Sequence, residues 1–113
     1  MIQLLKYDLE EIILIKHVVM WEFKDFAEGN DKESNIKTAA QKIMELEDLV
    51  DVIRFIEVGI NLNESEAAYD LVLISEFDSL DDLDEYQNHP DHVKVKEFVG
   101  KVVDKRVVVD YEI

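Results

Sequence analysis

The chain has 113 residues, 48% hydrophobic and 35% charged, and 27 acidic against 12 basic side chains give a formal net charge of −15. This length suits one domain, and the charge disfavours nucleic acid and anionic membranes as partners. The absence of cysteine excludes disulfides and thiolate chemistry. No apolar run approaches the roughly 20 residues of a membrane span, and the first residues lack a signal-peptide pattern. We therefore expect a cytoplasmic protein.

Residues 1–13 are interpreted as an N-terminal extension, although their leucines could also form a short amphipathic turn. A single domain is expected over residues 14–113. Within it, alternating hydrophobicity predicts a long strand over residues 12–24. The face of this strand that we assign to the core carries Ile15, His17, Val19, Trp21 and Phe23.

A helix is expected to follow the first strand. Asn30 is a candidate N-cap, and Glu33 three residues later resembles a capping box. Apolar residues at helical spacing carry this helix to about Leu49. Two strands are predicted next, over residues 52–60 and 68–77, with a polar hairpin connection at residues 61–66 between them.

Ser79 is expected to cap a second helix, with Asp82 three residues later. Pro90 interrupts that helix, because proline lacks an N–H and clashes with the preceding turn. Since proline suits the first helical position, another helix is predicted to start there. A last strand is predicted over residues 106–113. We place Val107, Val109, Tyr111 and Ile113 on one of its faces, and Val108, Asp110 and Glu112 on the other.

This order of elements predicts an α+β, ferredoxin-like βαββαβ fold whose four-stranded antiparallel sheet carries helices on one face. The other face is expected to have an apolar centre and a charged rim. The centre is assigned to Val18, Met20, Val72, Ile74 and Val108, and the rim to Lys16, Glu22, Asp70, Glu76, Asp110 and Glu112. Such a face favours packing against a second copy, so we expect a homodimer.

All three histidines fall in two short segments, 15–23 and 86–93. His92 lies in the apolar arc of the last helix, and Tyr86 continues the apolar line of the helix before it. His17 shares the core face of the first strand. His89 falls at the edge of the arc, so we expect it to serve the helix break at Pro90.

The chemical interpretation makes His92 a general base near a helix start, where the positive end of the helix dipole disfavours imidazolium. Tyr86 would polarise a carbonyl oxygen and His17 would orient the substrate or a water, as enolisation or aldol closure requires. Trp21 and Phe23 are the candidate substrate contacts. The alternative is that these polar groups only satisfy one another inside the core.

A metal site is disfavoured by the same residues. His89, Asp91 and His92 include ligand types, but both histidines cannot face inward well. The acids between residues 78 and 85 are better explained as a favourable first helical turn with a wet outer face. No phosphate loop or nucleotide fingerprint is evident, so no cofactor or metal is expected.

Four segments together resemble the stress-responsive A/B barrel domain (Dabb) family, over about residues 14–113. They are Ile15–Lys24, Ala68–Leu73, Tyr86–Val93 with its His-Pro-Asp-His run, and Arg106–Tyr111. The resemblance implies a dimeric α+β barrel. It implies little about activity, since most members have no assigned reaction. One plant member is a polyketide cyclase that closes a ring by aldol condensation.

In that cyclase a tyrosine and a histidine placed like Tyr86 and His92 carry the chemistry, and a histidine matching His17 lies in the same cavity. Three functions therefore compete. The chain is a homodimer of unassigned role with a small-molecule cavity between sheet and helices, or a cofactor-independent cyclase, lyase or isomerase acting on a carbonyl or phenolic compound, or an oxygenase of a quinol-like substrate. An open pocket lined by the three residues would favour catalysis, and a solid core would exclude it.

Overall fold

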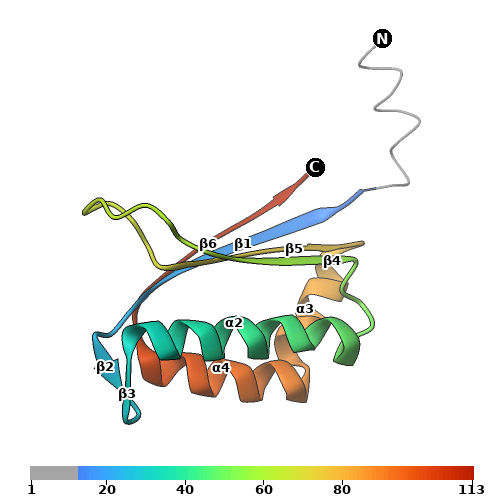
Figure 1. Ribbon diagram of the computed structural model, residues 1–113. Coiled ribbons are helices and arrows are strands. Elements are labelled where there is room, and N and C mark those ends of the chain that lie inside the picture. The colour runs from blue at the N-terminus through green and yellow to red at the C-terminus, as the bar shows by residue number, and fades with distance from the viewer. Residues whose placement is uncertain (1–12) are drawn as a thin grey trace.

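The computed structural model describes residues 13–113, so the expected extension, apart from Ile13, lies outside the described residues. Nine elements follow one another along the described chain (Figure 1). They are β1 (Ile15–Phe23), β2 (Phe26–Ala27), β3 (Asn30–Asp31), α2 (Lys32–Leu49), β4 (Phe55–Ile60), β5 (Leu71–Phe77), α3 (Leu80–Asn88), α4 (Pro90–Val102) and β6 (Val103–Glu112).

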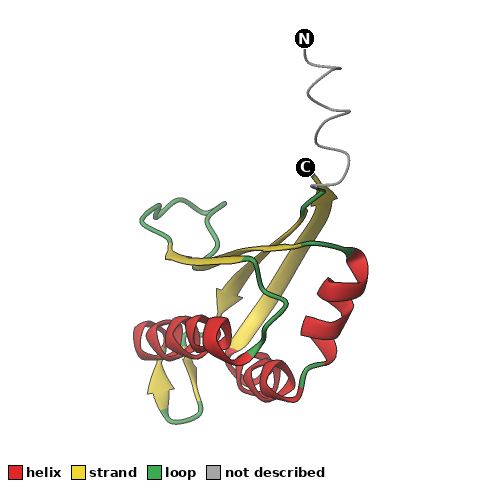
Figure 2. Cartoon of the chain, turned by 90° about the vertical axis from the view of Figure 1, so that its right-hand side faces the viewer, coloured by secondary structure: helices red, strands yellow, loops and turns green. Residues whose placement is uncertain are grey.

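The four long strands form one sheet in the order β4-β5-β1-β6, and every neighbouring pair is antiparallel. The helices lie together on one face of this sheet, and no helix or strand of residues 13–113 covers the other, bare face (Figures 1 and 2). The predicted ferredoxin-like α+β fold is therefore confirmed. None of the helices in the described part of the chain is long and apolar enough to cross a membrane.

Two clusters of buried side chains make up the core between the sheet and the helices. The larger cluster joins β1 and β5 to α2 and α4 around Val19, Phe23 and Ala39. The smaller cluster joins the other end of the sheet to α3 around Phe77 and Tyr86. The alternation predicted for β1 is confirmed, because its odd-numbered residues from Ile15 to Phe23 are all buried.

The predicted N-cap of the first helix was one residue early. Asp31 caps α2, and its carboxylate accepts a 2.8 Å hydrogen bond from the Ser34 N–H. Asn30 instead belongs to a small β2–β3 hairpin, whose turn places Glu28 and Gly29 at positive φ. The hairpin fixes where the chain turns into α2, and single-residue propensities did not reveal it.

All four long strands also start at other residues than predicted, and β1 begins at Ile15 instead of residue 12. Residues 52 and 53 belong to a turn, so β4 begins at Phe55 instead of residue 52. β5 begins at Leu71 instead of residue 68, and β6 begins directly after α4 at Val103 instead of residue 106. Apolar side chains that pack from a turn have the same spacing as those of a strand, which explains the error at β4.

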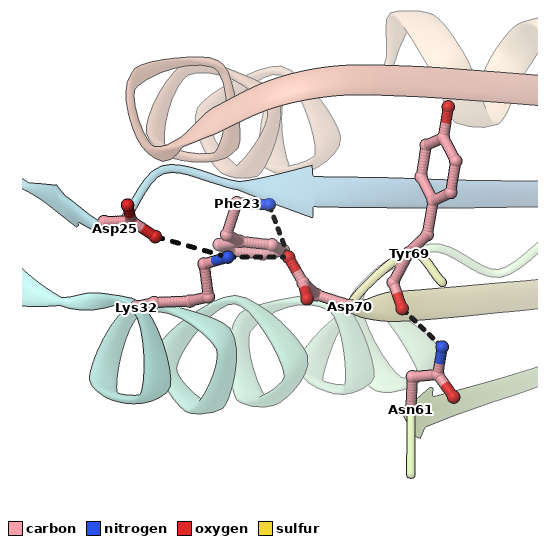
Figure 3. Close-up of polar contacts among 6 residues, drawn as sticks. All are labelled: Phe23, Asp25, Lys32, Asn61, Tyr69 and Asp70. Carbon is pink, nitrogen blue, oxygen red and sulfur yellow. Dashed lines mark hydrogen bonds and ion pairs between the residues drawn. The ribbon is translucent and has the colours of Figure 1, made fainter. Parts of the chain in front are cut away.

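A polar clamp precedes β5 (Figure 3). The Asp70 carboxylate accepts a 2.7 Å hydrogen bond from the Phe23 N–H, and it lies 3.7 Å from the Lys32 ammonium group. Lys32 also lies 3.5 Å from the Asp25 carboxylate. Asp70 therefore ties the end of β1 to the start of α2, and its predicted place on the rim of the bare face was wrong.

The faces assigned to β6 were reversed. Val108 pairs with Val19 and Asp110 pairs with His17, so both lie on the helix-covered side of the sheet. Alternation shows which residues share a face, but the pairing register decides which face that is. The sequence of β6 is apolar on both sides, so its pattern did not reveal the register.

The bare side of the sheet, called the open face below, is apolar at its centre. Val18 lies there with Ile74 and Val109 as its cross-strand partners, and Met20 lies beside them with Val72 and Val107 as its own. Charged residues at its margins are Lys16, Glu22, Glu57, Glu76 and Lys105. The apolar centre is as predicted, except that Val107 and Val109 replace Val108.

Candidate functional site

A cavity of about 450 Å³ lies between the helix-covered side of the sheet and the helices α2, α3 and α4. Side chains from three of the four long strands and all three helices line it. The lining consists of His17, Val19, Trp21, Ile43, Leu46, Leu73, Tyr86, Gln87, His92, Val95, Lys96, Val99, Gly100, Val103, Arg106, Val108 and Asp110. Its inner wall is apolar, and its polar groups come from β1, α3, α4 and β6.

Tyr86 enters this cavity from the last turn of α3, and it is 1% exposed. Its ring packs 5.0 Å from the Phe77 ring and 4.4 Å from the His92 ring, between centroids. No buried side-chain oxygen or nitrogen of the described residues lacks a partner. The Tyr86 hydroxyl makes no hydrogen bond with residues 13–113, and Tyr86 lines the cavity. Burial raises the pKa of Tyr86, so the phenol stays protonated as a donor.

His92 lies in the first turn of α4, where Pro90 restarts the helix. Its Nδ1 is 3.0 Å from the Gln87 carbonyl oxygen, which accepts only from a protonated nitrogen. The neutral ring then keeps the lone pair of Nε2 free. Burial lowers the pKa of His92, and the charges of Lys96, His17 and Arg106 lower it further, against the opposing effect of the Gln87 hydrogen bond.

His17 comes from the middle of the sheet and is 2% exposed. Its Nδ1 lies 2.5 Å from the Asp110 carboxylate on the neighbouring strand β6. The His17 and Tyr86 rings meet edge to face, with 6.3 Å between centroids. Tyr86 therefore stands between two imidazoles. One is held by a carboxylate and the other by a peptide carbonyl.

Trp21 lines the cavity, whereas Phe23 does not. Phe23 is 1% exposed in the larger core cluster, beyond an irregularity in the β1–β6 pairing at Glu22. His89 also lies outside the cavity lining. Its Nδ1 accepts a 3.1 Å hydrogen bond from the Asp91 N–H and caps α4, which fits its expected place at the helix break.

Several lining residues were not predicted from the sequence. Lys96 and Gly100 follow His92 by four and eight residues, and that helical spacing would have identified them. Arg106 and Asp110 lie on the same face of β6 as Val108. They were not predicted to line the cavity because the faces of β6 were assigned in reverse. Within residues 13–113, no group of three histidine, aspartate or glutamate side chains is arranged to hold a metal ion.

The arrangement combines the elements of acid–base chemistry at a carbonyl compound. A neutral imidazole with a free nitrogen can take a proton, and a protonated phenol can donate a hydrogen bond to the developing oxyanion. The apolar wall around Trp21 and Leu73 limits solvent around them. The site is thus suited to proton transfer on a small, mostly apolar molecule.

Comparisons with known proteins agree on one family. A family profile described as the stress responsive A/B barrel domain matches residues 15–113. A stress-response A/B barrel domain-containing protein of Arabidopsis thaliana is 31% identical over 99 residues. The match covers 87% of this chain and 36% of the Arabidopsis protein, so the chain spans little more than a third of that relative.

Solved structures match over most of their length. A dimeric protein of unknown function with a ferredoxin-like fold from Bacteroides fragilis is 35% identical, with a TM-score of 0.79, covering 88% of this chain and 96% of that one. A hydroxynitrile lyase from Passiflora edulis is 21% identical, with a TM-score of 0.72, covering 88% of this chain and 93% of that one. The second likeness concerns the fold alone.

Proposed function

The chain belongs to the stress-responsive A/B barrel domain family, and we propose that it is a homodimer that catalyses cofactor-independent proton transfer on a small carbonyl or phenolic compound in its cavity. One observation carries the proposal. The Tyr86 hydroxyl and the His92 Nε2 both lack a partner among the described residues, and both residues line the same cavity as His17. The reaction class is that of a cyclase, lyase or isomerase.

In the proposed reaction His92 removes a proton from the carbon next to a substrate carbonyl. The electron pair of the broken C–H bond moves to the carbonyl oxygen, and the Tyr86 O–H stabilises the resulting enolate by a hydrogen bond. If the enolate is conjugated with a carbon–carbon double bond, it takes the proton back at the far carbon of that bond; otherwise its α-carbon attacks a second carbonyl in the same molecule. His92 returns its proton to the product, and His17 orients the substrate.

Features of the fold support this assignment. The same scaffold is that of a hydroxynitrile lyase from Passiflora edulis, so it is compatible with a lyase site. The open face has an apolar centre around Val18 and Ile74, as an interface between two copies would. The Bacteroides fragilis relative, at 35% identity, is described as dimeric.

A non-catalytic role is the second candidate, and it is supported by the packing of the site. The rings of His17, Tyr86 and His92 touch in one row, and each histidine already has a fixed hydrogen-bond partner. Such a row can stabilise a core and still border a ligand cavity. In that case the chain would bind a small molecule without changing it.

Deuterium exchange separates the two candidates. The substrate is 1-phenylbutane-1,3-dione, whose methylene protons exchange through the enolate, and NMR in D₂O follows their loss. We expect the protein to accelerate exchange, and Tyr86→Phe and His92→Gln each to reduce that acceleration roughly a hundredfold. His89→Asn is the matched control, because it changes a histidine outside the cavity and keeps a capping oxygen. Equal acceleration by all variants, or none by the wild type, would contradict catalysis.

A further inference from the structure

The cavity carries an excess of positive charge in a strongly acidic protein. Two cations, Lys96 and Arg106, and one carboxylate, Asp110, are the charged side chains of its lining. The whole chain has a formal net charge of −15, so most of its surface repels anions. The positive charge of the cavity lining is therefore not explained by the overall charge of the chain.

The two cations come from different elements that face each other across the cavity. Lys96 lies on α4, one helical turn after His92, and Arg106 lies on β6 opposite Trp21. Both are exposed residues whose side chains border the cavity. Both are near enough to His92 for their charges to affect it, and Arg106 is near enough to affect Tyr86 as well.

Neither cation is used inside the described part of the chain. The ion pairs of residues 13–113 involve neighbouring cations such as Lys101, which lies 3.9 Å from Glu28, but neither Lys96 nor Arg106. The one carboxylate of the lining, Asp110, is already bonded to His17. In a chain with 27 acidic residues, two cations that pair with no acid in this range are available to a ligand.

We propose that Lys96 and Arg106 hold the carboxylate of the substrate, so that the cavity takes an apolar oxo acid in preference to a neutral carbonyl compound. This inference rests on the proposed function. Lys96 lies about 6 Å along the helix axis from His92, at 1.5 Å per residue. If Lys96 and Arg106 bind the carboxylate of a substrate, a carbonyl group a few bonds away in the same molecule would lie beside His92 and Tyr86.

The charge balance favours a carboxylate over a more highly charged group. Two cations and one carboxylate leave the lining one positive charge in excess, which suits a monoanion. The rest of the lining is largely aliphatic, so the remainder of the ligand must be apolar. Arginine offers a planar fork that matches a carboxylate, and lysine adds a second point charge.

The test compares an acid with its uncharged amide. Trp21 is the single tryptophan of the chain and lines the cavity, so its fluorescence reports binding. The probes are 4-phenylbutanoate and 4-phenylbutanamide. We expect the wild type to bind the acid about tenfold more tightly, and Lys96→Met and Arg106→Met each to reduce the preference about fivefold, the upper range for exposed charge pairs. Added salt should weaken it too.

Lys101→Met is the matched control, since it removes an exposed cation from the same helix outside the cavity lining, and it should leave the preference unchanged. Arg106→Lys, which keeps the charge, should retain most of it. Equal affinity for acid and amide, failure of the acid to bind, or an equal loss in Lys101→Met would overturn the inference. The exchange of the neutral diketone would be unaffected by that result, so the proposed catalysis would be judged separately.

Discussion

His17 and His92 line one cavity but have different partners. His17 is bonded to a carboxylate, whereas His92 is bonded to a peptide carbonyl and lies near the charges of Lys96 and Arg106. Burial and the nearby cations favour the neutral form of the His92 ring. The surroundings therefore assign the role of base to His92 and leave His17 as an orienting group.

The lowered pKa of His92 has a consequence for stability. The unfolded chain has an ordinary histidine pKa of about 6.5, so it binds a proton more readily than the folded chain does. The contribution of neutral His92 to stability is complete above that value and is lost as the pH falls through the lower folded value. We expect the free energy of unfolding to fall more between about pH 7 and pH 5 in the wild type than in His92→Gln.

Urea unfolding at a series of pH values measures this difference. Leu62→Gln, at a non-titrating loop residue that is 94% exposed, is the control and should keep the wild-type pH dependence. Parallel curves for the wild type and His92→Gln would show that burial of His92 does not affect its proton affinity.

The hydrogen bond between Asp110 and His17 leads to a second prediction about single residues. His17 is 2% exposed, so loss of its partner leaves a buried polar nitrogen unsatisfied. We expect Asp110→Ala to lower the free energy of unfolding by about 1–3 kcal/mol. Asp110→Asn keeps an acceptor oxygen and should lose less. Chemical denaturation ranks the variants, and an equal loss in both would show that the acceptor is not what matters.

For individual helices and strands, the sequence predicted their presence and type better than the residues at which they begin and end. The strand–helix–strand–strand–helix pair–strand order, the alternation of β1 and the helix break at Pro90 followed from local patterns. The faces of β6 did not, because register depends on pairing with a strand more than 80 residues earlier. For the same reason Asp110 was not predicted as a cavity residue, whereas Tyr86, His92 and His17 were predicted to lie together.

The first residue of α2 is a helix boundary that can be tested by mutation. The Asp31 carboxylate accepts a hydrogen bond from the Ser34 N–H, and this bond lowers the pKa of Asp31. We expect Asp31→Ala to destabilise the protein more than Asn30→Ala, because within residues 13–113 the Asn30 side chain bonds only the Glu28 carbonyl in the hairpin. Thermal unfolding of the two variants decides between the caps. A larger loss for Asn30→Ala would favour the cap predicted from the sequence.

For the molecule as a whole, the open face is the feature that the single chain does not explain. Half-buried and exposed apolar residues occupy its centre, with Val109 at 59% exposure, although 35% of the residues of the chain are charged. Apolar patches of this kind mark interaction sites. A second copy has the same patch, so the two faces can pack about a two-fold axis.

A single charge at the centre of the open face should therefore separate the copies. Val18 lies between Ile74 and Val109, so Val18→Arg would bury an unpaired cation in the proposed interface. We expect light scattering at micromolar concentration to give twice the 13.2 kDa chain mass for the wild type and one chain mass for Val18→Arg. Leu62→Arg, at a loop residue that is 94% exposed, is the control and should remain dimeric. Because each chain carries a charge of −15, added salt should also strengthen wild-type association. A monomeric wild type at every salt concentration would refute the interface and leave the open face without an assigned partner.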